Sequence, residues 1–287
     1  MGAITAELVR CAEERGVTLR TATPVRRVVI ADGVAVGVEL ADGTVAPHDI
    51  VISNADPVTT CRYLIGDHPL MADYQAVLAS YDPATWYAPT KIALALDRLP
   101  AFAIDEPLAQ QHIGGLFICP SPAAQAAAFA AAKAGRLPNP NMIALMTPTT
   151  TDPTLAPPGK HLMCLYVRCT PLTCDGAPWD ASNEHFLYED ALDQLSAYLP
   201  DLRACIRAQH LISPTTLQRE YGLATGEIMH LPLETPWLFD QRPVPGYSDY
   251  TTPIAQLFLC GAGTHPGGTV TGAPGHNCAQ RIIAEFA

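Results

Sequence analysis

The segment that most constrains the fold lies close to the C-terminal end of the sequence. The apolar run at residues 257–260 reads as a buried strand, and a helix is predicted from about Pro274 to Phe286. Six glycines occur between residues 261 and 275, from the end of the strand to the start of the helix. Glycine-rich loops and helix N-termini present backbone amides to phosphates and other anionic oxygens. A tight turn would account for one or two of these glycines, so six of them favour a cofactor-binding loop in an α/β protein.

Several common chemistries have no signature in the sequence. The glycine loop is not the dinucleotide fingerprint G-x-G-x-x-G, because Pro266 occupies the position of the third glycine. The sequence also contains no Walker A, H-E-x-x-H or G-x-S-x-G motif, so the common NTPase and hydrolase mechanisms lack support. The nine cysteines include no C-x-x-C pair. We therefore expect no metal site, and reduced thiols in a cytoplasmic protein.

Composition excludes further classes of protein. Hydrophobic residues make up 48% of the 287 residues and charged residues 16%, which is not the balance of a disordered chain. The net charge is −11, with 17 Lys and Arg against 28 Asp and Glu, so no nucleic-acid partner is expected. No apolar run reaches the length of a membrane-spanning helix, and we expect no transmembrane segment.

The N-terminal part of the sequence reads as one helix and four strands. Residues 3–15 carry apolar side chains at helical spacing and predict an amphipathic helix. Strands are predicted at 25–30, 34–40 and 44–47, and Asp-Gly turns between them indicate an antiparallel β-meander. Residues 49–53 form a short, mostly apolar strand of the kind that is covered on both faces of a sheet.

The sequence between residues 58 and 251 has a different composition, with frequent proline and few charged residues in its first half. Strands are predicted at 91–96, 116–119, 142–146 and 161–168, and helices at 123–134 and 183–199, the second capped by Ser182 or Asn183. This region reads as an inserted α+β domain, and its apolar residues form either an ordinary core or the wall of an apolar substrate chamber. We therefore expect two domains. One combines residues 1–57 with residues 252–287, and the other consists of residues 58–251.

Longer stretches of the sequence resemble one enzyme family. The run LFLCGAGTHPGGTVTGAPGHNCAQRI at residues 257–282 resembles the C-terminal flavin-contacting segment of the phytoene-desaturase-like (carotenoid-type) FAD-dependent oxidoreductases. Within them it is most similar to the pyridine nucleotide-disulphide oxidoreductase domain-containing branch. Further similar segments lie at residues 1–28, 51–57, 112–121, 152–167 and 241–254. The resemblance implies a mixed α/β fold: an incomplete FAD-binding, Rossmann-like domain with a β-meander, plus an inserted α+β substrate domain.

The resemblance also implies which residues bind FAD. The cofactor-binding positions are Val25, Gly261, Ala262, Gly263, Gly267, Gly268, Thr269 and Val270. Val25 would pair with the adenine edge through its backbone, and Gly261 and Ala262 would pass the ribityl–pyrophosphate. Many related flavoenzymes have an Asp at the position of Ala262, which cannot reach a ribityl hydroxyl. The amides of Thr269 and Val270 would face N1 and C2=O of the flavin, where a helix N-terminus stabilises the negative charge of the reduced ring.

Two histidines are candidate catalytic residues, His265 and His230. A lone histidine is more often structural, but His265 lies inside the glycine loop, and both are expected close to the flavin. His230 belongs to residues 226–232, which follow the family's Gly-rich, His-containing run only in part. Leu231 replaces a usual glycine there.

One part of the family pattern is absent from this sequence. Relatives begin with a βαβ unit that carries G-x-G-x-x-G and binds the FAD pyrophosphate. We therefore expect the C-terminal portion of an FAD-dependent oxidoreductase that acts on an apolar, isoprenoid-like substrate. Its strands would need cover from a complementary N-terminal FAD-binding chain or from a homo-oligomer. The alternative is a non-catalytic binding or assembly subunit that has lost FAD, and a third reading is a truncated gene or misplaced start.

Overall fold

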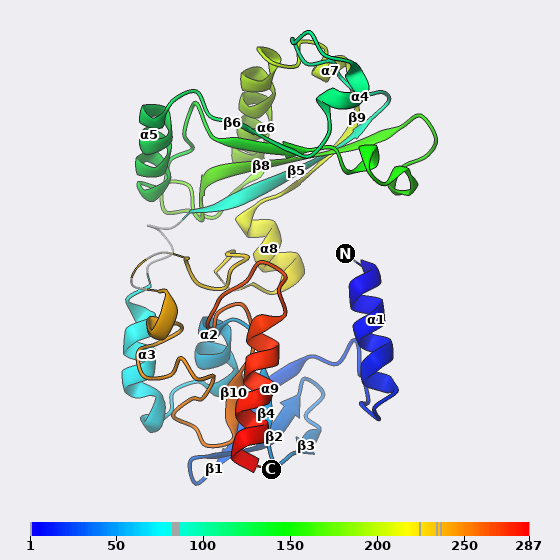
Figure 1. Ribbon diagram of the computed structural model, residues 1–287. Coiled ribbons are helices and arrows are strands. Elements are labelled where there is room, and N and C mark those ends of the chain that lie inside the picture. Colours follow the sequence, from blue (N-terminus) through cyan, green and yellow to red (C-terminus); the bar gives the residue numbers. More distant parts are fainter. Residues whose placement is uncertain (1, 82–86, 224, 234, 236, 287) are drawn as a thin grey trace.

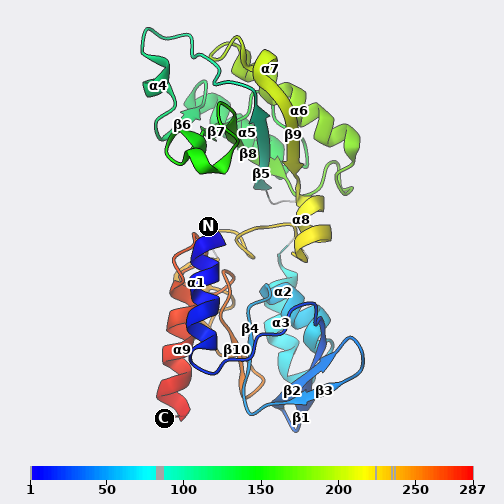
Figure 2. The same ribbon diagram turned by 90° about the vertical axis from the view of Figure 1, so that its right-hand side faces the viewer.

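The computed structural model of the chain describes residues 2–81, 87–223, 225–233, 235 and 237–286, with the backbone alone at 108 and 109. These residues form two lobes that meet at a narrow waist (Figures 1 and 2). The lower lobe contains the first four strands and the C-terminal helix, and the upper lobe is built from the middle of the sequence (Figure 1). None of the described helices is both long enough and apolar enough to cross a membrane.

The predicted β-meander is present at the base of the lower lobe. Strands β1 (Val25–Ala31), β2 (Val34–Leu40) and β3 (Val45–Pro47) pair in order, each antiparallel to the next. At the first turn Asp32 and Gly33 have φ values of 49° and 79°. These left-handed conformations are the ones that an Asp-Gly turn between two strands requires. The meander is therefore confirmed.

Two short parallel strands form the sheet from which the glycine loop leaves. β4 (Val51–Ser53) pairs with β10 (Leu257–Leu259), and Phe258 packs with Cys278 of α9 (Ala273–Phe286). The sequence predicted that β4 would be covered on both faces. On β4 itself this cover is incomplete, because Ile52 in the middle of the strand is 50% exposed, which agrees with the expectation that the sheet lacks the cover of a βαβ unit. The described residues cover both faces of the sheet at β10, where all three side chains are buried, and leave one face partly open at Ile52.

The core of the lower lobe combines segments from both ends of the expected inserted domain. After β4 come α2 (Pro57–Thr59), the π-helix η1 (Thr60–Ile65), the 3-10 helix η2 (Pro69–Met71) and α3 (Ala72–Ala79). Their buried side chains pack with residues from the returning chain, among them Leu231, Trp237 and Val244. Packing thus joins both ends of the expected substrate domain to the lower lobe. The functional division at residues 58 and 251 stays a prediction.

The upper lobe is built on an antiparallel sheet with the strand order β6-β7-β8-β5-β9. Its strands are β5 (Tyr87–Leu96), β6 (Gly115–Ile118), β7 (Ile143–Met146), β8 (His161–Pro171) and β9 (Ile206–Ile212). The first four strands were predicted from their apolar runs. β9 was not, because it is an edge strand whose four central side chains are exposed. Such a segment shows no apolar alternation.

Helices complete the upper lobe. α6 (Ala181–Ser196) packs Leu187, Leu192 and Leu195 against the buried side chains of β5, β7 and β8. The remaining helices are α4 (Leu108–Gln111), α5 (Pro122–Lys133), α7 (Leu202–Cys205) and α8 (Pro214–Tyr221), with 3-10 turns η4 (Pro148–Thr150), η5 (Pro153–Leu155) and η6 (Phe239–Gln241). The cap of α6 is Asp180 rather than Ser182 or Asn183. The Asp180 carboxylate accepts the Asn183 amide at 2.9 Å, and the Asn183 side chain accepts the Asp180 amide at 3.2 Å.

The first helix lies apart from both lobes in Figure 1. α1 (Gly2–Glu13) corresponds to the predicted amphipathic helix, but it has no buried residue. Its apolar side chains Ile4 and Leu8 are 55% and 66% exposed. An apolar helix face in water is the kind of surface that binds a further piece of protein.

Candidate functional site

The glycine loop presents several backbone amides outwards. The amides of Thr264 and Gly267 donate within the loop, to the carbonyls of Gly261 at 3.0 Å and Thr264 at 2.8 Å. The described residues offer no comparable acceptor to the amides of Gly268, Thr269 and Val270. The Val270 side chain is 77% exposed, so this end of the loop is at the surface. The loop therefore fits an external acceptor such as the oxygen of a flavin.

Backbone conformation sets the same residues apart. Thr269 and Val270 have φ values of 83° and 61°, so two β-branched residues in a row lie in the left-handed region. This conformation is strained for β-branched side chains. Such strain gathers where the chain serves a function, since nothing in folding alone favours it. The cofactor-binding role expected for these two amides stays a prediction.

Close packing explains several of the glycines. A Cβ atom on Gly261 would lie 2.7 Å from the carbonyl oxygen of Asn54, and one on Gly263 would lie 2.3 Å from Cδ of Pro57. A Cβ on Gly268 would lie 2.8 Å from Sδ of Met229. The loop therefore needs glycine partly to fit against the turn after β4 and against the segment that contains His230. Packing against protein therefore accounts for part of the glycine pattern.

The structure places His230 beside the glycine loop, and its expected closeness to a flavin stays a prediction. Its Cε1 atom lies 3.1 Å from the position of a Cβ on Gly261. Its Nδ1 atom is buried and has no hydrogen-bond partner among the described residues. Burial lowers the pKa of His230. A neutral imidazole with an unpaired nitrogen beside the loop is suited to a ligand contact.

The other expected site residues lie in different settings. The backbone carbonyl of His265 accepts a hydrogen bond from the Tyr250 hydroxyl at 3.0 Å. Val25 begins β1, where it pairs with Leu40 in the meander. The carbonyl of Ala262 is bound by Arg242, which fixes the loop at that point. The roles expected for these residues and for the glycines stay predictions.

Arg242 is the main structural support of the site and was not predicted from the sequence. It is completely buried, and its guanidinium donates to the carbonyls of Met229, Leu231, Pro232, Trp237 and Ala262 at 2.7–3.2 Å. The planar fork of arginine can serve this many acceptors at once. One side chain thus joins the glycine loop to the segment that contains His230. A single arginine in a loop carries no sequence signal for such a role.

Glu227 is a second buried charged residue in the same segment. Its side chain is 4% exposed, and Oε1 accepts the Met229 amide at 2.9 Å. Burial raises the pKa of Glu227 to about 7, although the Met229 amide and Arg242 both act in the opposite direction. Burial likewise lowers the pKa of Arg242 to about 10. The carboxyl of Glu227 can therefore exchange a proton near neutral pH.

A cavity of about 410 Å³ lies between the upper sheet and the segment at residues 227–233. Its walls include Tyr87, Phe129 and Tyr166 from the upper lobe, and Met229 and Leu233 from the returning chain. Met229 also faces Gly268, and the Leu233 side chain lies 2.9 Å from the position of a Cβ on Gly267. The cavity is therefore adjacent to the glycine loop, and its walls are largely apolar.

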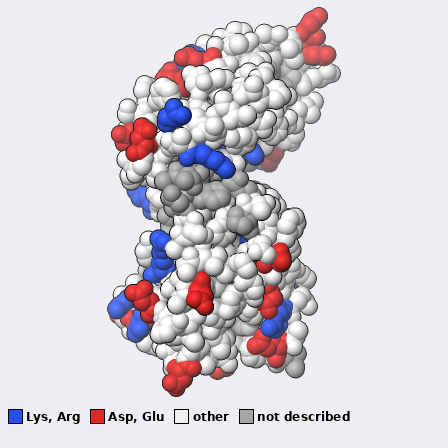
Figure 3. All heavy atoms as spheres, turned by 90° about the vertical axis from the view of Figure 1, so that its left-hand side faces the viewer, with Lys and Arg blue, Asp and Glu red and all other residues white. Residues whose placement is uncertain are grey.

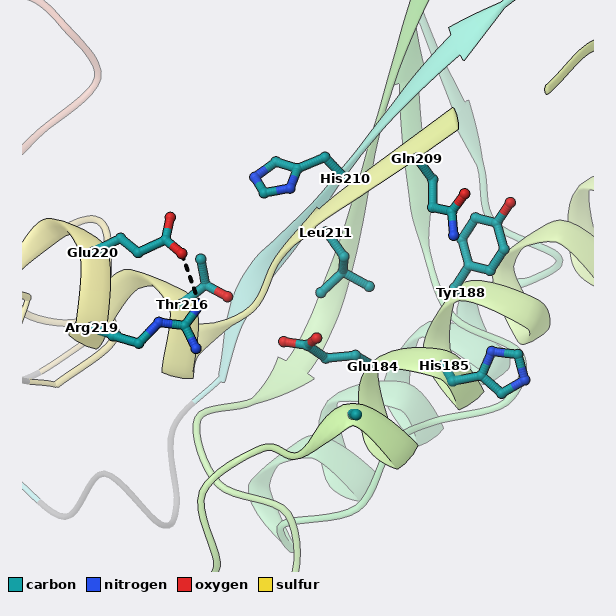
Figure 4. A pocket seen from close by; sticks show the side chains of 10 residues that line it. Glu184, His185, Tyr188, Gln209, His210, Leu211, Thr216, Arg219 and Glu220 are labelled. Atoms are coloured by element: carbon teal, nitrogen blue, oxygen red, sulfur yellow. Dashed lines mark hydrogen bonds and ion pairs between the residues drawn. The ribbon is translucent and has the colours of Figure 1, made fainter. Parts of the chain in front are cut away.

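A second cavity, on the outer side of the upper lobe, does not have the features of an active site. It lies among α6, β9 and α8, and Figure 4 shows His185 and His210 extending away from each other. Its charged groups are already paired: Glu184 accepts the Ser213 hydroxyl at 2.6 Å, and Arg219 binds Glu220 at 2.8 Å. In the part of the chain that is described, no three His, Cys, Asp or Glu side chains could hold a metal ion.

Two solved structures share this fold. One is an oxidoreductase from Methanosarcina mazei, with a TM-score of 0.55, 20% identity, and coverage of 97% of this chain and 52% of that chain. The other is a protein from Pyrococcus furiosus, with a TM-score of 0.54, 16% identity, and coverage of 98% and 52%. At these identities the likeness concerns the fold alone. The expected mixed α/β fold with a partial Rossmann-like domain is confirmed.

The sequence itself identifies the family. Residues 1–283 match the flavin containing amine oxidoreductases, and the chain belongs to this family. The mouse pyridine nucleotide-disulfide oxidoreductase domain-containing protein 2 is 33% identical over 294 residues, covering 100% of this chain and 50% of the mouse protein. A lycopene-forming phytoene desaturase from Pseudescherichia vulneris is 30% identical over 277 residues, covering 94% and 52%. The resemblance seen in the sequence is confirmed, and the chain spans about half the length of these relatives.

Proposed function

We propose that the chain is a portion of an FAD-dependent, dehydrogenase- or desaturase-like oxidoreductase that acts on C–C or C–N bonds of an apolar, isoprenoid-like substrate. The observation that carries this proposal is the row of open amides at residues 268–270, next to an apolar cavity. Membership of a flavin-containing family agrees with it. A bound FAD would supply the hydride acceptor, while the protein supplies orientation and charge stabilisation.

The residues of the chain would divide this work. The amides of Thr269 and Val270 would stabilise negative charge on the flavin ring, and the loop from Gly261 to Gly268 would pass the ribityl–pyrophosphate. Val25 would bind the adenine through its backbone. His230 and His265 are the proposed catalytic side chains. The unpaired Nδ1 of His230 supports the first of these assignments.

The proposal includes a partner. The exposed Ile52 of β4 and the exposed apolar face of α1 favour cover by a complementary N-terminal FAD-binding polypeptide or by a second copy of this chain. A cytoplasmic location is part of the proposal too, and nine unbonded cysteines agree with a reducing compartment.

Flavin binding tests the proposal directly. The purified chain is incubated with FAD, alone and together with a separately expressed polypeptide that carries a G-x-G-x-x-G unit. Visible flavin absorbance that stays with the chain after desalting is the expected result. Lack of flavin under both conditions would favour the rival function, a non-catalytic binding or assembly subunit.

The two histidines need their own test. In the flavin-loaded protein, His230→Ala and His265→Ala should each slow flavin reduction by substrate, by about 100-fold for a residue that transfers a proton. His276→Ala, an exposed histidine of α9, is the matched control. Unchanged reduction kinetics in both variants would reject the catalytic assignment while leaving FAD binding intact.

A further inference from the structure

The second face of the upper sheet is mostly apolar, with two cations placed on it. Strand register places Phe117, Ala144, Tyr166, Lys91 and Ile212 in one row across the five strands, and Met146, Cys164, Ala93 and His210 in the next. Along β5 and β8 these positions alternate with the buried residues of the core. Tyr166 of the first row also lines the cavity beside the glycine loop.

Lys91 and Arg168 are the two cations of this surface. The Nζ atom of Lys91 lies 5.8 Å from the centre of the Tyr166 ring, and Arg168 follows two residues after Tyr166, where it lines the cavity. The described residues give neither side chain a hydrogen-bond acceptor or an acidic partner. On the face of the molecule shown in Figure 3, Lys and Arg side chains lie around the waist between the lobes.

Unpaired cations are informative in this protein, because acidic residues outnumber basic ones by 28 to 17. Several other basic side chains of the upper lobe have acidic partners: Arg98 binds Asp201, Arg203 binds Glu189 and Asp193, and Lys160 binds Asp97. Lys91 and Arg168 instead stand on an apolar and aromatic surface. Arg168 is exposed and Lys91 is half-buried, so both cations are accessible to an anionic ligand group and can bind it by charge-assisted hydrogen bonds.

The geometry suits a shared anion. Lys91 is directly opposite Tyr166, so it is a diagonal neighbour of Arg168, and diagonal positions are roughly 7–8 Å apart at the backbone. Both side chains are long enough to reach one carboxylate, and arginine can bind it through two parallel hydrogen bonds. The nearest acidic group on the cavity wall is Glu227, which is buried and occupied by the Met229 amide. Its pKa of about 7 weakens its repulsion of an anion.

We infer that the substrate is an amphipathic anion, an apolar chain that ends in a carboxylate bound by Arg168 and Lys91. Its apolar part lies against Phe129 and Tyr87 and extends towards Met229 and Leu233, next to the glycine loop. This inference rests on the proposed function, because it assigns the substrate of the same site. The inferred substrate is therefore not a pure hydrocarbon but an apolar molecule with one charged end.

Binding of simple probes tests the inference without turnover. The full chain is titrated by calorimetry with laurate and with dodecanol, which share an apolar chain and differ in charge. We expect laurate to bind the wild-type chain about 10-fold more tightly than dodecanol, as one charge-assisted contact predicts. Arg168→Gln and Lys91→Gln should each remove most of this preference and leave dodecanol binding within about twofold of wild type. Arg168→Lys should retain part of it.

Two further variants separate charge from apolar contact. Phe129→Ala should weaken laurate and dodecanol alike, because its ring lines the cavity. Arg136→Gln removes an exposed charge outside the cavity lining and should change neither. Equal binding of the two probes, no binding of laurate, or a charge preference that survives both Arg168→Gln and Lys91→Gln would each overturn the inference.

The same preparations distinguish this inference from the proposed function. Each is incubated with FAD and the N-terminal polypeptide, and retained flavin is measured. Flavin binding without a preference for laurate would reject the inferred substrate class and leave the proposed function intact. A laurate preference that depends on Arg168, in a chain that never holds flavin, would keep the anion site and reject the oxidoreductase.

Discussion

Both lobes of the protein are built around a sheet, but they differ in how far the chain itself completes them. In the upper lobe, five strands are joined in one ladder, and α6 closes a core over one face. In the lower lobe, β4 and β10 form a pair with Ile52 half exposed, and α1 buries none of its residues. The upper lobe has the properties of an independent folding unit, whereas the lower lobe has a surface that needs further cover.

The lower lobe also contains a contrast of its own. The segment around residues 229–242 has its carbonyls tied together by Arg242, while the neighbouring amides at residues 268–270 are open. A rigid support next to unsatisfied donors is what a preformed ligand site requires. The open amides and the exposed face of α1 are the surfaces at which a cofactor and a partner are proposed.

The largest effect is expected from Arg242→Leu. It would leave five buried carbonyls without their donor, and removal of one partner from such a buried polar network costs roughly 3–5 kcal/mol. We expect hydrogen exchange, followed by mass spectrometry, to accelerate in β10 and the loop after it. Peptides from β5 and β8 should keep their protection, because they belong to the other core.

A conservative variant sharpens this result. Arg242→Lys keeps the charge but offers three donors without the planar fork, so it should recover only a small part of the lost stability. Full recovery by lysine would mean that the charge near Glu227, rather than the hydrogen bonds to carbonyls, is what matters. Loss of protection in both lobes at once would show that they unfold as one unit.

The reciprocal change is Leu192→Ala in the upper lobe. Leu192 is 2% exposed in the core between α6 and the sheet, so the truncation should cost about 3 kcal/mol. Exchange should accelerate in β5, β7 and β8, while the meander of β1 and β2 keeps its protection. If the meander is equally affected, the two cores are coupled through the waist. Ala191→Gly, on the same helix, combines a helix-propensity cost of about 1 kcal/mol with the loss of one buried methyl group, and should cost less than Leu192→Ala.

The same difference explains what could be predicted from the sequence. Strands with apolar alternation or Asp-Gly turns, such as Val34–Leu40, were predicted because local pattern and burial agree. The edge strand at Ile206–Ile212 was missed because it is held by backbone pairing to β5, with its central side chains in water. The cap of α6 was displaced by a few residues, because Ser182, Asn183 and Asp180 all have capping side chains and only geometry chooses among them.

For the site, the sequence predicted the loop but not its support. Six glycines and a following helix mark residues 261–275 without any tertiary information. The roles of Arg242 and Glu227 depend on burial and on partners far from them in the sequence, which no local pattern encodes. Arg168 and Lys91 likewise became candidates only when strand register placed both near Tyr166 on one face.

A smaller effect, and one that depends on pH, is expected for Glu227→Gln. Burial raises the pKa of Glu227 from 4.5 to about 7, so the folded state holds a proton that the unfolded state has released. The free energy of unfolding should therefore fall as pH rises from about 5 to about 7, by roughly 2 kcal/mol. Glutamine keeps the bond from the Met229 amide and cannot ionise, so the variant should lack this slope. Urea denaturation at several pH values measures it, and identical slopes in both proteins would contradict the raised pKa.

The smallest effect is expected for Leu8→Ala on α1. Leu8 is 66% exposed on a helix without buried residues, so its truncation should change the free energy of unfolding by less than about 0.5 kcal/mol. Leu257→Ala, at 1% exposure in β10, is the matched control and should cost roughly 2–5 kcal/mol. A large loss of unfolding free energy from Leu8→Ala would show that α1 is packed in solution.

If that loss depends on protein concentration, a second copy of the chain covers the helix. If it does not, α1 packs on its own lobe. A loss that appears only when the N-terminal polypeptide is added would identify that polypeptide as the missing cover of the lower lobe.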